Sequence, residues 1–402
     1  MPGRQPLAAD GLFRAHRLFW VSVAIVVIGL VLRAPIVAVA PVVELLREQL
    51  GMSASVVALL TGIPVLCFAL ATPLAVWLAS RGGTAFAMVA GLVAILVGVV
   101  LRSGGGVATA FAGTALLGVG ITVGNVVVPV VIRREYSARR ARLMTPVYAS
   151  MLNLGSALAT VLPAPIAAQL GWRPALAVWG FAAAVAVAVV LGLNGWRTAL
   201  VPRALPRPES TPPRAARSAS VWMLAAAFAG QAFSYYAVTA WLPTLLSDEI
   251  GTDATASGAI AAIFQLCAIG GAFLVPLVAS RAGDVVAIVV IGTLWMLVPI
   301  GFLLAPGAWA VWSVAGGVAQ GGGFTAIMLL VVAVARSDRH ASRVSGLVQG
   351  IAYALASLGP VVLGALHEAS GGWALPLGAV LVATSVYLVV GTLAGLRITR
   401  AG

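Results

Sequence analysis

The stretch LLREQLG at residues 45–51 is repeated as LLSDEIG at residues 245–251, at an offset of 200 residues. The same offset recurs at two further places, and it becomes 201 residues in the later part of each half. The further pairs are LC at 66–67 and 266–267, ASR at 79–81 and 279–281, Arg142 and Arg343, Ser156 and Ser357, and GW at 171–172 and 372–373. The chain therefore consists of two halves that repeat one another.

The composition is that of a membrane protein. Hydrophobic residues make up 61% of the chain, charged residues only 9%, and the mean hydropathy is +1.07, whereas soluble globular domains carry roughly 25% charged residues. A tandem repeat of a multi-span membrane unit favours a secondary transporter. The net charge of +13 comes from arginines in short clusters between apolar stretches, which indicates membrane topology and excludes nucleic-acid binding as the main role.

A spanning helix needs about 20 apolar residues, and this length predicts twelve spans in an all-α integral membrane protein. We expect two pseudo-symmetric six-helix bundles at residues 1–193 and 220–402, joined by a proline- and arginine-rich linker at residues 194–219. Pro41 and Arg33 indicate that the first span is retained rather than cleaved as a signal peptide. The predicted spans are residues 19–43, 54–79, 84–102, 107–132, 143–169, 173–193, 220–246, 255–280, 285–304, 307–335, 342–368 and 373–396.

The arginines predict the orientation of these spans. Twenty of them fall on the side that holds both termini and the linker, while only Arg47, Arg102 and Arg173 fall on the other side. Cytoplasmic loops of inner-membrane proteins are rich in arginine and lysine. We therefore expect a multi-pass protein of the inner (plasma) membrane with cytoplasmic N- and C-termini.

Polar side chains within spans indicate which helices face an aqueous pathway. The third and sixth spans carry almost none, and the ninth carries only Thr293. On the seventh and eleventh spans, two trios of polar residues recur at every fourth position, so each trio forms a stripe along one face of its helix. The trios are Gln231, Tyr235 and Thr239, and Gln349, Tyr353 and Ser357. Two roles stay open for them: lining a cavity, or hydrogen bonding between helices.

Arg33 is the strongest single signal, because it lies inside the first span. An arginine near the centre of a bilayer costs at least ~2.5 kcal/mol, and all eleven acidic residues of the chain fall in loops or at helix ends. Our hypothesis is that the planar guanidinium of Arg33 binds an anionic or strongly polar substrate. The alternative is that Arg33 bonds to helix-end carbonyls or to Asn and Gln side chains.

The absence of acids from the spans also bears on energy coupling. Proton-coupled carriers place Asp, Glu or His within a span, whereas His16, His340 and His367 lie at or beyond helix ends. Coupling by a dedicated intramembrane carboxylate is not expected. Facilitated diffusion, exchange and co-transport of a proton by the substrate itself stay open. Cys67 and Cys267 are interpreted as packing thiols, and we expect neither a metal nor a cofactor.

The chain resembles the major facilitator superfamily in its twelve spans, its two repeats, its central linker, and Arg81 and Arg281 in the loops after the second and eighth spans. Ser80 and Ser280 stand where that superfamily usually has aspartate. The chain is more specifically similar to the cyanate permease and nitroimidazole exporter family, whose members are linked to small anions and to neutral heterocycles. The matching strings are LRAP at 32–35, VAP at 39–41, LLT at 59–61, PVLCF at 64–68, GNVVVP at 124–129, YYA at 235–237, AWLP at 240–243, FQL at 264–266, QGG at 320–322, SG at 345–346 with Gln349, LGP at 358–360, GALH at 364–367 and GGW at 371–373.

We therefore expect a secondary active or facilitative transporter that moves a small polar, anionic organic solute by alternating access, as a monomer in the lipid bilayer. A broad-specificity drug or nitroimidazole exporter is the first alternative, and a non-transporting membrane sensor is a remote one. An enzyme is not expected, because no span places a nucleophile beside a base. The candidate substrate-binding residues are Arg33, Asn125, Tyr148, Gln231, Tyr235, Tyr236, Trp241, Gln265, Gln320, Gln349 and Tyr353.

Overall fold

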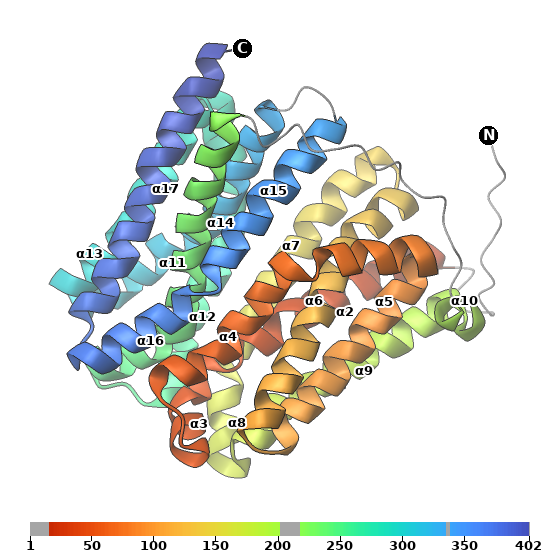
Figure 1. Ribbon diagram of the computed structural model, residues 1–402, viewed down its shortest axis with the longest axis horizontal. Coiled ribbons are helices and arrows are strands. Elements are labelled where there is room, and N and C mark those ends of the chain that lie inside the picture. The colour runs from red at the N-terminus through yellow and green to blue at the C-terminus, as the bar shows by residue number, and fades with distance from the viewer. Residues whose placement is uncertain (1–15, 202–217, 335–337, 402) are drawn as a thin grey trace.

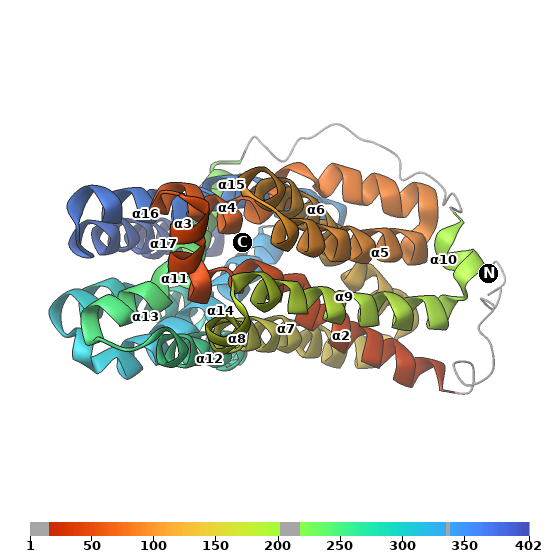
Figure 2. The same cartoon turned by 90° about the horizontal axis from the view of Figure 1, so that it is seen from below.

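The computed structural model describes residues 16–201, 218–334 and 338–401, and over these ranges the chain is helical, without a β-strand. The helices form two bundles that lie side by side, α2–α10 in one and α11–α17 in the other (Figures 1 and 2). The predicted all-α membrane fold is confirmed.

The bounds of the helices follow the predicted spans closely. The first bundle contains α2 (Arg17–Val37), η1 (Ala40–Val42), α3 (Val43–Leu50), α4 (Ala54–Leu70), α5 (Thr72–Gly104), α6 (Val107–Glu135), α7 (Ala138–Val161), α8 (Pro163–Leu170), α9 (Trp172–Asn194) and α10 (Trp196–Leu200). The second bundle contains α11 (Ala219–Ile250), α12 (Ala254–Ala282), α13 (Asp284–Leu304), η3 (Pro306–Ala308), α14 (Trp309–Ala333), α15 (Asp338–Ala356), α16 (Gly359–Ser370) and α17 (Ala374–Ala401).

Twelve spans are obtained once the break near Gly83 is taken into account. Eleven helical stretches of the described residues are long and apolar enough to cross a membrane, and α4 is a shorter apolar helix of 17 residues. α5 contains a kink at Gly83, whose φ of 82° is a conformation that glycine adopts without steric cost. The part of α5 before Gly83 therefore completes the second predicted span with α4, and the part after it is the third span.

The predicted linker at residues 194–219 begins with the short helix α10. Residues 202–217 lie outside the described part of the chain, so the exact domain boundary stays a prediction.

Equivalent tryptophans of the two halves make similar hydrogen bonds, to acceptors that differ by one position in the repeat. Trp172 donates its indole N–H to Gln49 Oε1 at 2.8 Å, and Trp373 donates to Asp248 Oδ2 at 2.9 Å. The buried positions of α5 and α13 also match at an offset of 200 residues. The matched positions are Ala87 and Ala287, Met88 and Ile288, Leu92 and Gly292, Ile95 and Trp295, Gly98 and Val298, and Arg102 and Phe302.

The two bundles contact each other through α4 with α15 and α16, and through α7 with α12. Glycines allow this close approach. A Cβ atom on Gly258 would collide with the backbone carbonyl of Thr160, and one on Gly364 would lie 2.9 Å from the carbonyl of Ala54. The bundles meet near α3, α8 and α16 and separate toward the end at which α15 begins (Figure 1). α5, α9, α13 and α17 pack mainly within their own bundle, in keeping with their apolar sequences.

Substitution of Gly258 tests this contact. We expect Gly258→Ala to destabilise the protein by about 1–3 kcal/mol, because the added methyl group meets a backbone carbonyl that cannot rotate away. The matched control is Gly270→Ala on the same helix, where a Cβ meets nothing within 4 Å and the better helix propensity of alanine applies. Thermal unfolding of the purified protein measures both, and equal melting temperatures of the two variants would contradict the described contact.

Candidate functional site

Arg33 lies between the two bundles, on α2, and it contacts tyrosines of α11. Its Cζ atom is 4.8 Å from the centroid of the Tyr235 ring, which is a cation–π distance. The hydroxyl group of Tyr236 also makes a polar contact with the guanidinium. Both tyrosines are buried, at 3% exposure each, whereas Arg33 keeps partial exposure. The charge of Arg33 therefore lies among aromatic side chains of the second bundle.

Two further tyrosines lie within electrostatic reach of the same charge. Tyr148 of α7 and Tyr353 of α15 both interact with Arg33. Tyr148 donates its hydroxyl proton to Asn125 Oδ1 at 2.9 Å. The Tyr353 ring packs edge-on against Phe68 at 5.4 Å between centroids, and so joins the second bundle to the first. Six predicted site residues are thereby connected around one guanidinium: Arg33, Asn125, Tyr148, Tyr235, Tyr236 and Tyr353.

Three predicted glutamines form a polar layer inside the second bundle. Gln231 donates to the backbone carbonyl of Gln320 at 3.1 Å, and Gln265 donates to Thr239 Oγ1 at 3.4 Å. The stripe of α11 that contains Tyr235 thus makes hydrogen bonds to neighbouring helices. Hydrogen bonding between helices was one of the two roles that the sequence left open, and lining a cavity was the other. Among the described residues, three buried polar atoms of this region have no protein partner: Tyr235 Oη, Gln265 Oε1 and Gln320 Nε2.

The last two predicted residues lie in different surroundings. Gln349 keeps partial exposure and donates to Ser345 Oγ at 2.7 Å, one turn earlier on α15. Trp241 is buried and donates its indole N–H to the carbonyl of Pro360 at 2.8 Å. The other ring contacts of Trp241 are with His367 and Trp373, so the structure does not bring it to the Arg33 cluster.

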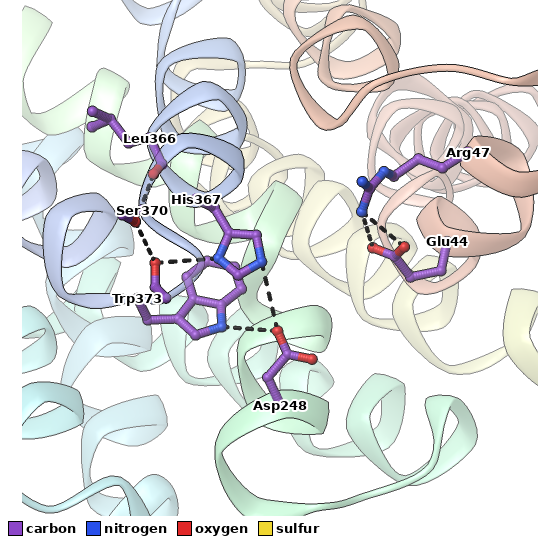
Figure 3. A network of polar contacts seen from close by, with 8 residues as sticks. Glu44, Arg47, Asp248, Leu366, His367, Ser370 and Trp373 are labelled. Carbon is purple, nitrogen blue, oxygen red and sulfur yellow. Dashed lines mark hydrogen bonds and ion pairs between the residues drawn. The ribbon is translucent and has the colours of Figure 1, made fainter.

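His367 takes part in a network at the end where the bundles meet (Figure 3). Its imidazole stacks on Trp373 at 4.2 Å between centroids, and its Nε2 atom is 3.8 Å from Asp248 Oδ2, which also accepts the Trp373 N–H. The sequence placed His367 at a helix end but gave no signal for these partners. On the first bundle, Arg47 pairs with Glu44 at 2.9 Å, as Figure 3 shows.

Arg102 has surroundings that the sequence did not predict. The topology count placed it at the end of the third span, on the side of Arg47 and Arg173. Its side chain is fully buried, at 0% exposure, and its Nη1 donates to the carbonyl of Pro35 at 2.6 Å. Its position in the last turn of an apolar helix gave no sign of which way the side chain turns. No carboxylate of the described residues pairs with Arg102 or with Arg33.

Sulfur and acidic side chains do not form a metal site in the described part of the chain, where no group of three or more His, Cys, Asp or Glu residues gathers. Cys67 and Cys267 are free thiols. They occupy equivalent packing positions, because Cys67 lies against Gly118 and Cys267 against Gly317.

Two helical bundles with a polar, charged cluster between them define a membrane carrier. The chain belongs to the Major Facilitator Superfamily, whose sequence profile matches residues 19–360. This membership confirms the resemblance and indicates a transporter of a small solute rather than an enzyme.

The chain is similar over nearly its whole length to several transporters. It is 32% identical over 388 residues to an uncharacterized transporter, YycB, of Bacillus subtilis (strain 168), with 94% of each chain covered. It is 28% identical to the 2-nitroimidazole transporter of Escherichia coli (strain K12), with 92% of this chain and 94% of that one covered. The cyanate transport protein CynX of the same strain is 29% identical, with coverages of 87% and 90%.

Solved structures support the fold. A bacterial homologue of the human lysosomal transporter Spinster, in an inward-facing and unoccupied conformation, matches with a TM-score of 0.71 at 18% identity. The match covers 97% of this chain and 98% of that one.

The contact between Arg33 and Tyr235 yields a stability prediction. We expect Tyr235→Leu to lower the free energy of unfolding by about 1–3 kcal/mol, because it removes both the cation–π contact and aromatic packing. Tyr235→Phe keeps the ring and removes a hydroxyl group without a protein partner, so its effect is smaller. Thermal unfolding in detergent measures both, and an equal loss in the two variants would show that the hydroxyl group rather than the ring face is what matters.

Proposed function

We propose that the protein is a secondary carrier that moves a small anionic organic solute across the inner membrane by alternating access, with Arg33 as the substrate anchor. The observation that carries this proposal is the state of Arg33. Its guanidinium lies among tyrosines at the boundary between the bundles, and no carboxylate of the described residues pairs with it. A carboxylate or similar planar anion would supply the missing counter-charge through two parallel hydrogen bonds.

The surrounding side chains suit a small, flat anion. Hydroxyl groups of Tyr236 and Tyr353 supply hydrogen-bond donors close to Arg33, and the rings of Tyr235 and Tyr353 supply apolar faces. Asn125 is held by Tyr148 and keeps partial exposure, so its amide N–H₂ group is available to the same ligand.

The proposed orientation places the separated ends of the bundles in the cytoplasm. The ends of α2 and α6 that carry Arg17, Arg133 and Arg134 would be cytoplasmic by the positive-inside rule. The described shape then corresponds to an inward-facing carrier whose outer end is closed near α3, α8 and α16. We infer a monomer, because each chain contains both bundles needed for alternating access.

An exporter of neutral heterocycles is the second candidate, and the aromatic character of the site favours it. Tyr353 packs between Phe68 and Phe228, at 5.4 and 5.5 Å between ring centroids. One curated relative is a 2-nitroimidazole transporter and another transports cyanate, so the two candidates correspond to two named relatives. The role of Arg33 separates them, because a neutral ligand does not need its charge.

Ligand-induced thermal stabilisation tests the proposal. Purified protein is titrated with sodium cyanate, acetate, benzoate and 2-nitroimidazole, and the concentration that gives half of the maximal shift is compared among variants. We expect at least one of the three anions to stabilise the native chain and to bind about 10-fold or more weakly to Arg33→Ala, because a charge-assisted pair is lost. Arg33→Lys should be intermediate, since it keeps the charge without the fork.

Arg81→Ala is the control, because Arg81 is an exposed residue of α5 near the kink at Gly83 and makes none of the contacts described for the Arg33 cluster. Equal stabilisation of the native chain and Arg33→Ala by every effective anion would reject Arg33 as the anchor. Stabilisation by 2-nitroimidazole alone, unchanged in Arg33→Ala, would favour the exporter.

A further inference from the structure

The first helix of the chain is broken just beyond Arg33. The α-helical hydrogen-bond pattern of α2 ends at Val37, where Ala38 donates its N–H to the carbonyl of Ala34. The backbone keeps right-handed helical angles at Ala38 and Val39 and continues into the tighter turn η1 (Ala40–Val42). Pro41 has no N–H to continue the helix. The carbonyl of Pro35 would pair with the N–H of Val39 in a continuing helix. It instead accepts a hydrogen bond from Arg102 Nη1 at 2.6 Å.

The second half of the chain folds in the same way without a helix end at this place and without a buried arginine. α11 runs unbroken through Ala219–Ile250, and Trp241 stands at the position equivalent to Pro41. α13 carries the buried Phe302 at the position equivalent to Arg102. The broken helix and the buried arginine therefore occur together in one half, and a continuous helix with a buried phenylalanine occurs in the other.

Burial makes Arg102 a costly group to place here. Its side chain has 0% exposure, and its Nε and Nη2 atoms have no protein partner among the described residues. A buried guanidinium with a single hydrogen bond destabilises a fold relative to an apolar side chain of similar size. Because Phe302 fills the same place in the other half, close packing alone does not account for Arg102.

The break in α2 lies between two functional features of the molecule. Arg33 is two residues before the carbonyl that Arg102 holds. η1, directly after the break, packs against α11 and α12 of the second bundle, and Pro41 lies beside Gly258 at the close contact between bundles. A change in the geometry of the break would therefore move the guanidinium of Arg33 relative to the end where the bundles meet.

We propose that Arg102 is a positioning residue that holds the free carbonyl of Pro35, fixes the end of α2, and thereby sets the placement of Arg33 toward the substrate. The proposal extends the function proposed above and rests on it for the role of Arg33 in binding. The hydrogen bond itself, and its effect on the break, are independent of which solute is carried.

Two measurements without any ligand test the positioning role in the full chain. The first is hydrogen–deuterium exchange of peptides that cover residues 36–44. The second is the rate at which phenylglyoxal, a reagent for guanidinium groups, modifies Arg33, followed by mass spectrometry. We expect Arg102→Met to raise both rates by about 10-fold, since a hydrogen bond to a charged group contributes roughly 1.5–3 kcal/mol.

Phe302→Met is the matched control, because it makes the same substitution at the equivalent position of the second half and conserves core volume. Arg102→Lys keeps a charged donor and should restore both rates in part, and it serves as the deciding variant if Arg102→Met does not fold. The proposal is overturned if the two rates in the Arg102 variants equal those of the native chain. It is also overturned if Phe302→Met raises them equally.

A double-mutant cycle with sodium cyanate then connects Arg102 to binding. We expect Arg102→Met to weaken cyanate binding about 10-fold in the native background and not at all in the Arg33→Ala background, because the two residues act through one another. Equal weakening in both backgrounds would show that Arg102 acts on folding alone. If Arg33→Ala leaves the binding of cyanate and every other anion unchanged, the proposed function fails, while the ligand-free rates still decide the role of Arg102 at the break.

Discussion

The organisation of the candidate site depends on one constraint: a guanidinium lies inside a membrane span, and no carboxylate in the described ranges neutralises it. An ion pair would satisfy Arg33 but would also leave it unavailable for a ligand. The structure satisfies it in part instead, by the π-face of Tyr235 at 4.8 Å and by the hydroxyl group of Tyr236. Such contacts are weaker than a buried ion pair. They can therefore be exchanged for a stronger contact with an anion.

The two halves of the chain share a scaffold but contribute different chemistry to the site. Their common origin is visible in the paired tryptophan bonds, Trp172 to Gln49 and Trp373 to Asp248. The charges are not shared, because Phe233 and Phe302 stand at the positions equivalent to Arg33 and Arg102. The first half thus supplies the cations and the second half supplies most of the aromatic and amide groups, so the site is complete only when the two bundles face each other.

The sequence predicted the fold well because its signals are local and repeated. The length of the apolar stretches predicted twelve spans, and the 200-residue offset predicted two bundles. The observed helices α4 and α5 differ from the predicted second and third spans because Gly83 bends the backbone within α5. For the candidate site, periodicity on α11 selected Gln231 and Tyr235, but it could not tell a face toward neighbouring helices from a face toward a cavity. In the structure Gln231 bonds to the backbone of Gln320, and Tyr235 lies against Arg33.

The sequence could not predict the contacts of residues whose partners lie far along the chain. Trp241 is a residue type that suits a binding site. Its indole N–H, however, donates a hydrogen bond to the carbonyl of Pro360, 119 positions further along the chain. Arg102 was placed at the end of a span, but counting charges near helix ends cannot show whether a long side chain turns outward or folds back into the bundle. Both cases concern the direction of a side chain, which hydrophobic periodicity does not encode.

Occupancy of the site and separation of the bundles are linked through the same contacts. Arg33 belongs to the first bundle and Tyr235, Tyr236 and Tyr353 to the second, so the contacts of the guanidinium cross the boundary between the bundles. In the proposed function, an anion that pairs with Arg33 replaces part of these cross-bundle contacts with its own. A ligand shifts a conformational equilibrium only by its differential affinity for the two conformations. In the proposed function that difference arises because the anion and the tyrosines of the second bundle bind the same charge, that of Arg33.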